Sequence, residues 1–538
     1  MTSLAPSPTS PMRLPPIVRP EDRGGVGRYR MAVLIGLFGV SAYLLLVTRV
    51  MVQSSYDTWA AYFIAPVLFA LSAPLLRRML SRVEPDPWIR QAVVVGLVAK
   101  LLFGFVRFYV NELVLGHGDA RNYAYVGSLL ATEFRSFTFG GPAFQLYITD
   151  YHGTRFIRLL TGIIYVVTGA TQLGGYVVFS FISFWGLYFF YRAYSIAMPD
   201  GLRRRYVLLV FFLPSVVFWP SSIGKEAWMT TMLGFGAYGV ARLLTHQRFG
   251  YLCILSAMAG MATVRPHVAA IFFAGLGAAF ALRNSKGGGG TTKKVLGLLV
   301  LALVAGVLLS QLQSFFGQQD GLDAQQVFNE TSRRSGQGGA QFETAQPTSV
   351  AGLPWAVITV LFRPFLFEAG NLAGLVTALE GTVLLALFLW NLPRLIRLPG
   401  LMVARPYVGF AVVYTLIFTF AFSAISNFGI LARQRTQLFP IAVIVLTVPI
   451  ETTLRTRRDL ELRPVERAVG DRPSMPEPAG PGPQIGHRPL PYLTIGAQNR
   501  NEGAQAEGGQ LQRGPAPSQE PAWVSHHLRP RAETAAAP

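Results

Sequence analysis

Five short polar motifs interrupt an otherwise apolar chain, and they carry the side chains best suited to chemistry. They are Gly116-His117-Gly118-Asp119, Gly224-Lys225-Glu226, Arg265-Pro266-His267, Arg363 with Glu368, and Arg433-Gln434-Arg435. Each motif lies where an apolar run ends or breaks. Ionisable groups in such places are costly to keep, so they usually mark a ligand or ion site. One leading carboxylate among several arginines predicts a site for a charged, phosphate-bearing ligand.

Asp119 is the candidate catalytic residue. It follows an apolar run closely, stands after two glycines and precedes an amphipathic stretch that contains Tyr123. A carboxylate in this position can act as a general base and accept a proton from a hydroxyl group. The alternative role is to cap a helix that begins near Ala120, and one residue can fill both roles. His117 and Asp119 are the candidate ligands of a divalent cation, Mg²⁺ or Mn²⁺, although no group of residues has the spacing of a recognised metal site.

The other four motifs carry basic side chains that can bind phosphate. Lys225 stands at the start of a predicted helix, whose first amides add to an anion site. Arginine suits phosphate because its planar guanidinium donates two parallel hydrogen bonds and stays charged. We expect Arg433 and Arg435 to project to one side of an extended stretch or to lie close together at a helix start. The alternative for all of these cations is contact with lipid headgroups. The candidate binding residues are Lys225, Glu226, Arg265, His267, Arg363, Glu368, Arg433 and Arg435, together with Arg121 and Tyr123 beside Asp119.

The composition places the chain in a membrane. Of its 538 residues, 51% are hydrophobic and 14% are charged, whereas soluble proteins carry roughly 25% charged residues. The net charge of +20 is spread over short loops between apolar runs, as the positive-inside rule predicts, so no nucleic-acid partner is expected. The single cysteine, Cys253, lies in an apolar run and gives neither a disulfide framework nor a cysteine metal site.

The elements that must position these motifs are helices. Apolar runs of about 17–25 residues predict an all-α, polytopic membrane protein with about twelve transmembrane helices. The predicted spans are 31–51, 58–76, 91–112, 172–192, 206–220, 226–244, 249–264, 267–282, 295–313, 370–391, 404–425 and 437–453. Basic clusters occupy the N-terminus, the C-terminal segment and every even-numbered connection, so both termini are expected in the cytoplasm. All five motifs then fall on the extracytoplasmic side.

Three regions follow from this topology: a disordered cytoplasmic N-terminus at 1–30, a transmembrane domain at 31–453, and a disordered cytoplasmic tail at 454–538. The external loops are expected at about 113–171 and 314–369. The first should contain two helices that lie in the membrane interface. The second begins with a Gln-, Gly- and Ser-rich stretch that could order over a substrate, followed by a re-entrant or interfacial segment at 351–369.

The order and sidedness of these features resemble the GT-C superfamily of membrane glycosyltransferases, of the protein mannosyltransferase and aminoarabinose transferase type. The resemblance covers roughly residues 91–453. It rests on a span that leads into Gly118-Asp119-Ala120-Arg121-Asn122-Tyr123, two interfacial helices, a further span, the hairpin around Pro214-Ser215 and Gly224-Lys225-Glu226, and later external arginines. The chain departs from this pattern in two extra spans before the loop, a carboxylate without an adjacent acidic partner, and no soluble C-terminal domain.

The resemblance implies an inverting glycosyltransferase in the plasma (inner) membrane of a bacterium. It would move a sugar from a polyprenyl-phosphate-linked donor to a hydroxyl of a glycan, lipid or protein acceptor in cell-envelope assembly, with Asp119 as the base and the basic motifs on the phosphate. Two alternatives stay open: an O-antigen-type polymerase or ligase, and a flippase or transporter of lipid-linked sugars. A cavity in which Asp119 faces the arginines favours transfer, whereas a two-sided central path favours transport.

Overall fold

The computed structural model describes two long parts of the chain and a few short pieces between them. The described residues are 21–282 without 117 and 149–151, then 329, 331–333, 335–336 and 341–342, and finally 352–449. Within these ranges the secondary structure is helical, apart from one isolated antiparallel bridge between Gln341 and Asn427. The prediction of an all-α protein is therefore confirmed for the described part of the chain. The predicted span 295–313 and the predicted tail 454–538 lie outside it.

Five of the described helices are long and apolar enough to cross a membrane by length and composition. They are α1 (Glu21–Gln53), α2 (Tyr56–Ser81), α3 (Pro87–Val110) with its extension η1 (Asn111–Leu115), α7 (Gln172–Ala197) and α16 (Leu372–Trp390). Shorter apolar helices are α11 (Gly250–Ala262), α12 (Pro266–Leu282), α15 (Leu353–Phe362) and α19 (Pro406–Phe422). This agrees with a membrane protein, and the count of about twelve spans stays a prediction.

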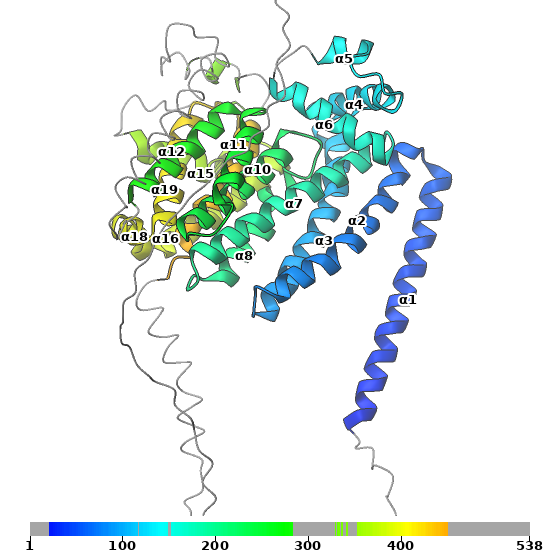
Figure 1. Cartoon of the computed structure of the whole chain (residues 1–538), viewed down its shortest axis with the longest axis horizontal. Coiled ribbons are helices and arrows are strands. Elements are labelled where there is room, and N and C mark those ends of the chain that lie inside the picture. Colours follow the sequence, from blue (N-terminus) through cyan, green and yellow to red (C-terminus); the bar gives the residue numbers. More distant parts are fainter. Residues whose placement is uncertain are drawn as a thin grey trace, which may run out of the picture. The chain divides into compact units, whose positions relative to one another are not determined.

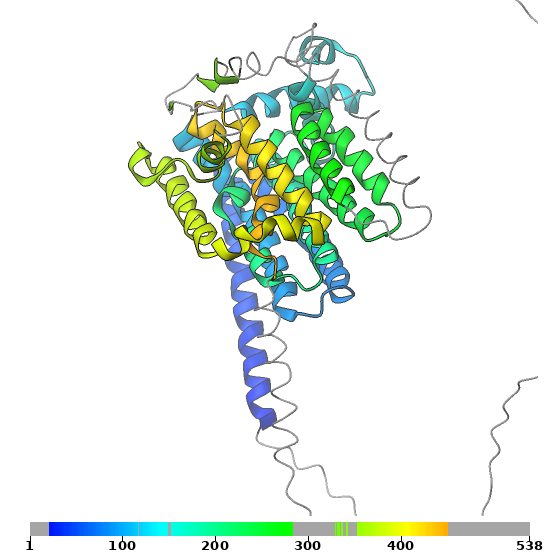
Figure 2. The ribbon, with the colours of Figure 1, turned by 90° about the vertical axis from the view of Figure 1, so that its left-hand side faces the viewer.

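The N-terminal helix differs from the other four in its surroundings. It begins at Glu21 and so extends into the segment 1–30 that was predicted to be disordered, since each further residue adds a hydrogen bond to a helix already formed. Only 6% of its most apolar stretch, within Val33–Gln53, is buried. Figures 1 and 2 show that α1 meets α2 at one end and then runs clear of the other helices.

Two predicted spans are not single helices. The segment 206–220 is divided into α8 (Arg203–Phe212) and α9 (Pro214–Phe218), because proline lacks an amide hydrogen and disfavours helical geometry in the residue before it. The described part of 437–453 is likewise broken near Pro440. It forms a run of short α and 3₁₀ turns, namely η4 (Arg435–Gln437), α21 (Phe439–Ala442) and η5 (Val443–Leu446). Almost every side chain in this run is buried.

The pairing of α7 with α10 (Lys225–Leu244) fixes the helix that carries the second motif. Gly186 of α7 faces Gly234 of α10, where an added Cβ would lie 2.1 Å from the carbonyl oxygen of Gly186. The two backbones therefore touch, as small residues permit in membrane helices. Helix α3 packs against the same helix α7. Because both α3 and α10 pack against α7, the C-terminal end of α3 is held near the first residues of α10.

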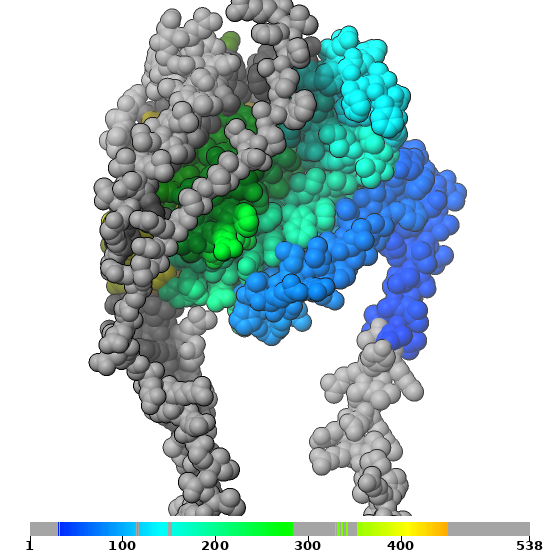
Figure 3. Space-filling model, viewed as in Figure 1, coloured from blue at the N-terminus to red at the C-terminus, as the bar shows by residue number. Residues whose placement is uncertain are grey.

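Three helices of the first long loop gather at one end of the described bundle. They are α4 (Asp119–Arg135), α5 (Pro142–Tyr147) and α6 (His152–Thr168), and their cyan atoms form one region of the surface in Figure 3. Helices α4 and α6 pack closely, since a Cβ on Gly127 would lie 2.6 Å from the Thr161 methyl group. The two predicted helices of this loop are present, and their place in a membrane interface stays a prediction.

Candidate functional site

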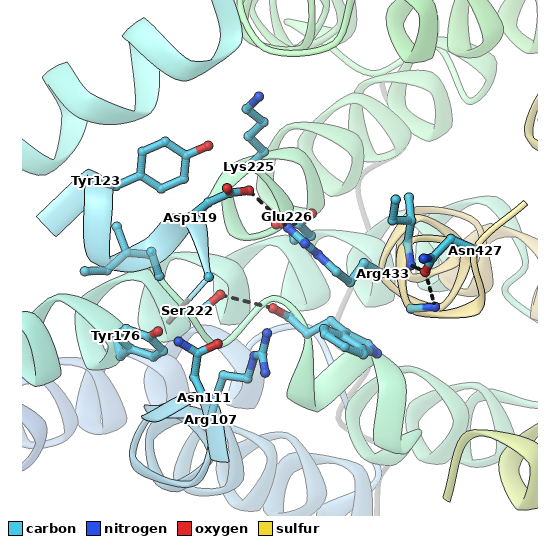
Figure 4. Close-up of a pocket in the computed structure, with 17 residues that line it drawn as sticks. Arg107, Asn111, Asp119, Tyr123, Tyr176, Ser222, Lys225, Glu226, Asn427 and Arg433 are labelled. Atoms are coloured by element: carbon cyan, nitrogen blue, oxygen red, sulfur yellow. Dashed lines mark hydrogen bonds and ion pairs between the residues drawn. The ribbon is translucent and has the colours of Figure 1, made fainter. Parts of the chain in front are cut away.

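A cavity of about 270 Å³ lies where α3 ends and where α4, α10 and α20 (Phe428–Gln434) begin. The chain reaches α4 through the turn at Gly116, whose φ of 66° favours glycine. Figure 4 shows the side chains that converge on the cavity from these elements. Its polar lining consists of Arg107, Asn111, Asp119, Tyr123, Tyr176, Trp219, Ser222, Lys225, Glu226, Asn427 and Arg433.

Two long helices direct their N-terminal ends at this cavity. Helix α4 begins at Asp119 after Gly118, and α10 begins at Lys225 after Gly224. The first amides of a helix carry partial positive charge and attract anions. Helix α20 adds little of this kind, because the Asn427 side chain accepts hydrogen bonds from two of its first amides, at 2.9 and 3.2 Å. Both long helix ends therefore favour an anionic ligand.

Asp119 is the accessible carboxylate of the site. Its side chain is 69% exposed, and one carboxylate oxygen lies 3.8 Å from Nη2 of Arg433. Gly118 occupies the N-cap position of α4, so the capping role considered for Asp119 is not the one it has. The carboxylate is consequently free to receive a proton from a hydroxyl that enters the cavity.

Glu226 joins two of the arginine motifs to the second motif. Its Oε1 accepts a hydrogen bond from Nη2 of Arg265 at 3.0 Å and another from Nη2 of Arg433 at 3.3 Å. The Glu226 side chain is only 4% exposed. A buried carboxylate held in this way positions its partners and is not open to substrate. We assign Glu226 to the support of the two arginines.

Burial and neighbouring charges set the protonation of the groups around Asp119. Burial, together with the carboxylates of Asp119 and Glu226, raises the pKa of Tyr123 to about 12, so its phenol stays a neutral donor. Burial lowers the pKa of the Lys225 ammonium, and Arg265 adds to this effect. Glu226 raises the pKa of Arg433. An anion in the cavity would stabilise the charged form of the lysine.

The charges at the cavity and directly behind it do not balance. Three cations and two carboxylates line the cavity: Arg107, Lys225 and Arg433, and Asp119 and Glu226. Three minus two leaves one positive charge; behind the lining, Arg265 adds a positive charge next to Glu226 and Glu112 adds a negative one near Tyr176. Such an excess in a partly closed site suits a ligand with one or two negative charges, such as a phosphate ester.

The fourth motif lies next to this site but does not line it. Arg363 donates to Glu368, with Nε and Oε1 at 3.0 Å, and its guanidinium lies over the rings of Phe342 and Phe428, at 4.6 and 5.5 Å. Burial opposes the ionisation of Glu368, but the hydrogen bonds from Arg363 and Phe365 outweigh it and lower the pKa of the carboxyl group. Arg363 and Glu368 therefore balance each other's charge within the protein.

Arg435 points away from the cavity. It is fully buried and donates to the carbonyl oxygen of Arg363 at 2.6 Å. Arg433, two residues earlier, faces Asp119. In a helical backbone, positions i and i+2 project in nearly opposite directions, which explains why these two arginines diverge instead of lying together.

The remaining predicted residues flank the cavity or lie outside the described residues. Arg121 lines an open depression of about 470 Å³ that shares Gly118 and Asp119 with the cavity. His267 is partly buried, with its ring 5.8 Å from that of Phe422. His117 lies outside the described residues. Among the described residues, no three His, Cys, Asp or Glu side chains are grouped so as to hold a metal ion.

The sequence reasoning missed several lining residues, above all Arg107, Asn111 and Tyr176. Arg107 lies inside the predicted span 91–112, where a charged residue is itself a signal of function. Asn111 and Tyr176 gave no comparable signal, because amides and phenols are ordinary near the ends of spans.

Comparisons with known proteins add no further information on this site. No protein-family model matches the chain, and no curated protein or solved structure shows significant similarity to it.

Proposed function

We propose that this protein is a membrane glycosyltransferase that moves a sugar from a polyprenyl-phosphate-linked donor to an acceptor hydroxyl on the extracytoplasmic face. The observation that carries the proposal is the accessible carboxylate of Asp119, 3.8 Å from Arg433, in a cavity also lined by Lys225 and Arg107. A base beside several cations suits a reaction in which a hydroxyl loses a proton while a phosphate departs.

The proposed reaction is a single inverting displacement. The acceptor oxygen forms a bond to the anomeric carbon of the sugar, and its proton passes to Asp119. The bond between that carbon and the phosphate oxygen breaks, and its electron pair stays on the phosphate. Polyprenyl phosphate is released, and the configuration at the anomeric carbon is inverted.

The excess of positive charge fits the change in charge that this reaction requires. The donor is a phosphodiester with one negative charge, whereas the released polyprenyl phosphate carries up to two. Arg433 and Lys225 line the cavity, and cations held in place before the reaction stabilise charge that develops during it. Glu226 keeps Arg433 in position through its hydrogen bond.

Replacement of the proposed base tests this function. We expect Asp119→Asn to abolish transfer, or to reduce its rate about 100-fold or more, because the amide cannot take the proton. The measurement is mass spectrometry of envelope glycans from cells that carry the variant, together with the binding of a lipid phosphate to the purified protein. Binding should persist in the variant.

The matched control is Asp86→Asn, which removes a carboxylate that pairs with Arg204 and does not line the cavity. Glycans should be unchanged in this control. Unchanged glycans in Asp119→Asn would contradict the assignment of Asp119 as the general base.

A further inference from the structure

Arg107 is a buried cation without a carboxylate partner among the described residues. It is 7% exposed, and its guanidinium lies over the rings of Phe218 and Trp219, at 4.7 and 4.6 Å from their centres. Its Nε and Nη1 have no hydrogen-bond partner in the described part of the chain. Aromatic faces stabilise such a cation only in part. A desolvated guanidinium with open donors is costly unless a ligand supplies the acceptor.

Two further side chains, Asn111 and Tyr176, line the same wall of the cavity as Arg107 and also carry hydrogen-bond donors that are unpaired in the described part of the chain. Asn111 is 4% exposed and Tyr176 is fully buried, and both line the cavity with Arg107. Within the described residues, neither Nδ2 of Asn111 nor the Tyr176 hydroxyl has a hydrogen-bond partner. Figure 4 shows Arg107, Asn111 and Tyr176 together below Asp119. Buried polar groups are nearly always paired, so three side chains with unpaired donors on one wall indicate an acceptor that is bound there.

This wall differs from the group around Glu226. There, Arg265 and Arg433 already share a carboxylate, so much of their charge is satisfied inside the protein. Arg107 forms no ion pair with a carboxylate among the described residues, and Glu226 acts on it only from a distance. The negative charge of a ligand therefore gains most at Arg107, where it also relieves the cost of burial.

The positions of these three residues near the ends of candidate membrane spans indicate the source of the anion. Arg107 and Asn111 belong to the candidate span Pro87–Val114, close to its end, and Tyr176 is near the start of Gln172–Ala197. The ends of membrane spans lie at the level of lipid headgroups. An anion bound at this level is one that a membrane lipid carries on its polar end.

We propose that Arg107, Asn111 and Tyr176 form a subsite for the phosphate oxygens of an isoprenoid lipid phosphate. The subsite deepens the proposed function, and it rests on that function for the choice of an isoprenoid lipid. Arg107 supplies the charge, and the amide and the phenol donate to separate phosphate oxygens.

Calorimetric titration of the purified full chain in detergent tests the subsite. The probes are citronellyl phosphate, inorganic phosphate and citronellol, which lacks the phosphate. We expect citronellyl phosphate to bind the full chain more tightly than the other two probes. Tyr176→Phe and Asn111→Leu should each weaken its binding about tenfold, and Arg107→Gln about 100-fold, because each removes a hydrogen bond to a charged group.

A second readout separates a binding role from a structural one. Without ligand, Tyr176→Phe and Asn111→Leu should melt at or above the temperature of the unmodified protein, because each removes an unpaired buried donor. Tyr165→Phe is the matched control, since its hydroxyl is also buried and unpartnered among the described residues but does not line the cavity. By the same argument it should melt at or above the temperature of the unmodified protein, and it should leave binding unchanged.

Three results would overturn the proposal. The first is wild-type affinity in both Tyr176→Phe and Asn111→Leu, and the second is an equal loss of affinity in Tyr165→Phe. The third is equally tight binding of inorganic phosphate, which would mean that the wall binds a free anion.

The proposed function can fail independently of the subsite. Normal binding by the wall variants, together with lost transfer in Asp119→Asn, would remove the subsite and keep the function. The reverse pattern would keep the subsite and remove the function.

Discussion

At the scale of single residues, the ionised side chains of the cavity have different tasks. Glu226 is buried and bonded to Arg265 and Arg433, so it fixes where these cations stand. Asp119 is largely exposed and can exchange a proton with a ligand. Lys225 lines the same cavity, and the cost of its burial falls when an anion enters.

The lowered pKa of Lys225 predicts a pH dependence of phosphate binding. Binding favours the charged lysine, so affinity is full below the pKa of Lys225 and is lost as the pH rises through it. Because burial lowers this pKa from the ordinary value of 10.5, we expect the affinity for citronellyl phosphate to fall as the pH rises at values below 10.5, where the phosphate itself keeps its charge. Calorimetric titration over this range gives the profile.

Lys225→Arg is the matched variant for this measurement, because arginine stays charged throughout the range. Its binding curve should be flat with pH. A wild-type curve as flat as that of Lys225→Arg would show that the charge of Lys225 does not contribute to binding.

At the scale of elements, the site depends on the contact between α7 and α10. The first residues of α10 are Lys225 and Glu226, and the helix is held by the approach of Gly234 to Gly186. A second close contact joins α4 and α6, where Gly127 meets the side chain of Thr161. Glycines at helix contacts thus set the spacing of the two helix ends that form the cavity.

A methyl group at the α7–α10 contact should therefore weaken both the fold and the site. In Gly234→Ala the new Cβ would lie 2.1 Å from the Gly186 carbonyl oxygen, so the helices must move apart. We expect a loss of roughly 1–3 kcal/mol in the free energy of unfolding, together with reduced transfer. Thermal or denaturant unfolding in detergent measures the first effect, and glycan analysis the second.

Gly39→Ala in α1 is the control for the change from glycine to alanine within a helix. An added Cβ there meets no atom within 4 Å, so the variant should be as stable as the unmodified protein or more so. Equal stability of Gly234→Ala and Gly39→Ala would contradict the role assigned to the contact.

At the scale of the whole molecule, contacts connect all five motifs. Asp119 faces Arg433, which shares Glu226 with Arg265, while Arg435 donates to the carbonyl oxygen of Arg363. The motifs therefore lie in one region of the helical bundle. The side of the membrane on which this region lies stays a prediction from the basic loops.

Cysteine labelling tests this sidedness. The only cysteine, Cys253, is buried, so Cys253→Ala gives a background without a thiol. A cysteine at Thr138, in the exposed turn after α4, should react with a membrane-impermeant maleimide in intact spheroplasts. A cysteine at Gln247, in the exposed turn between α10 and α11, should react only after permeabilisation. The opposite labelling pattern would place the cavity on the cytoplasmic side of the membrane.

The sequence predicted most helices of the described part well, because a run of apolar residues is a local property that is read without neighbours. The observed bounds of α7, α10, α11, α12 and α16 lie within a few residues of the predicted ones. The breaks at Pro214 and Pro440 were missed, since the apolar pattern continues through both prolines.

The site was predictable in part for the same reason. Asp119, Lys225 and Arg433 interrupt apolar runs and were found by residue type and position. Only the tertiary structure decided that these three line one cavity, that Arg435 turns away from it, and that Arg107 presents open donors to it. The physical reason is that partners of a buried charge come from helices far apart in the chain, and close packing at glycine contacts determines which helix ends meet.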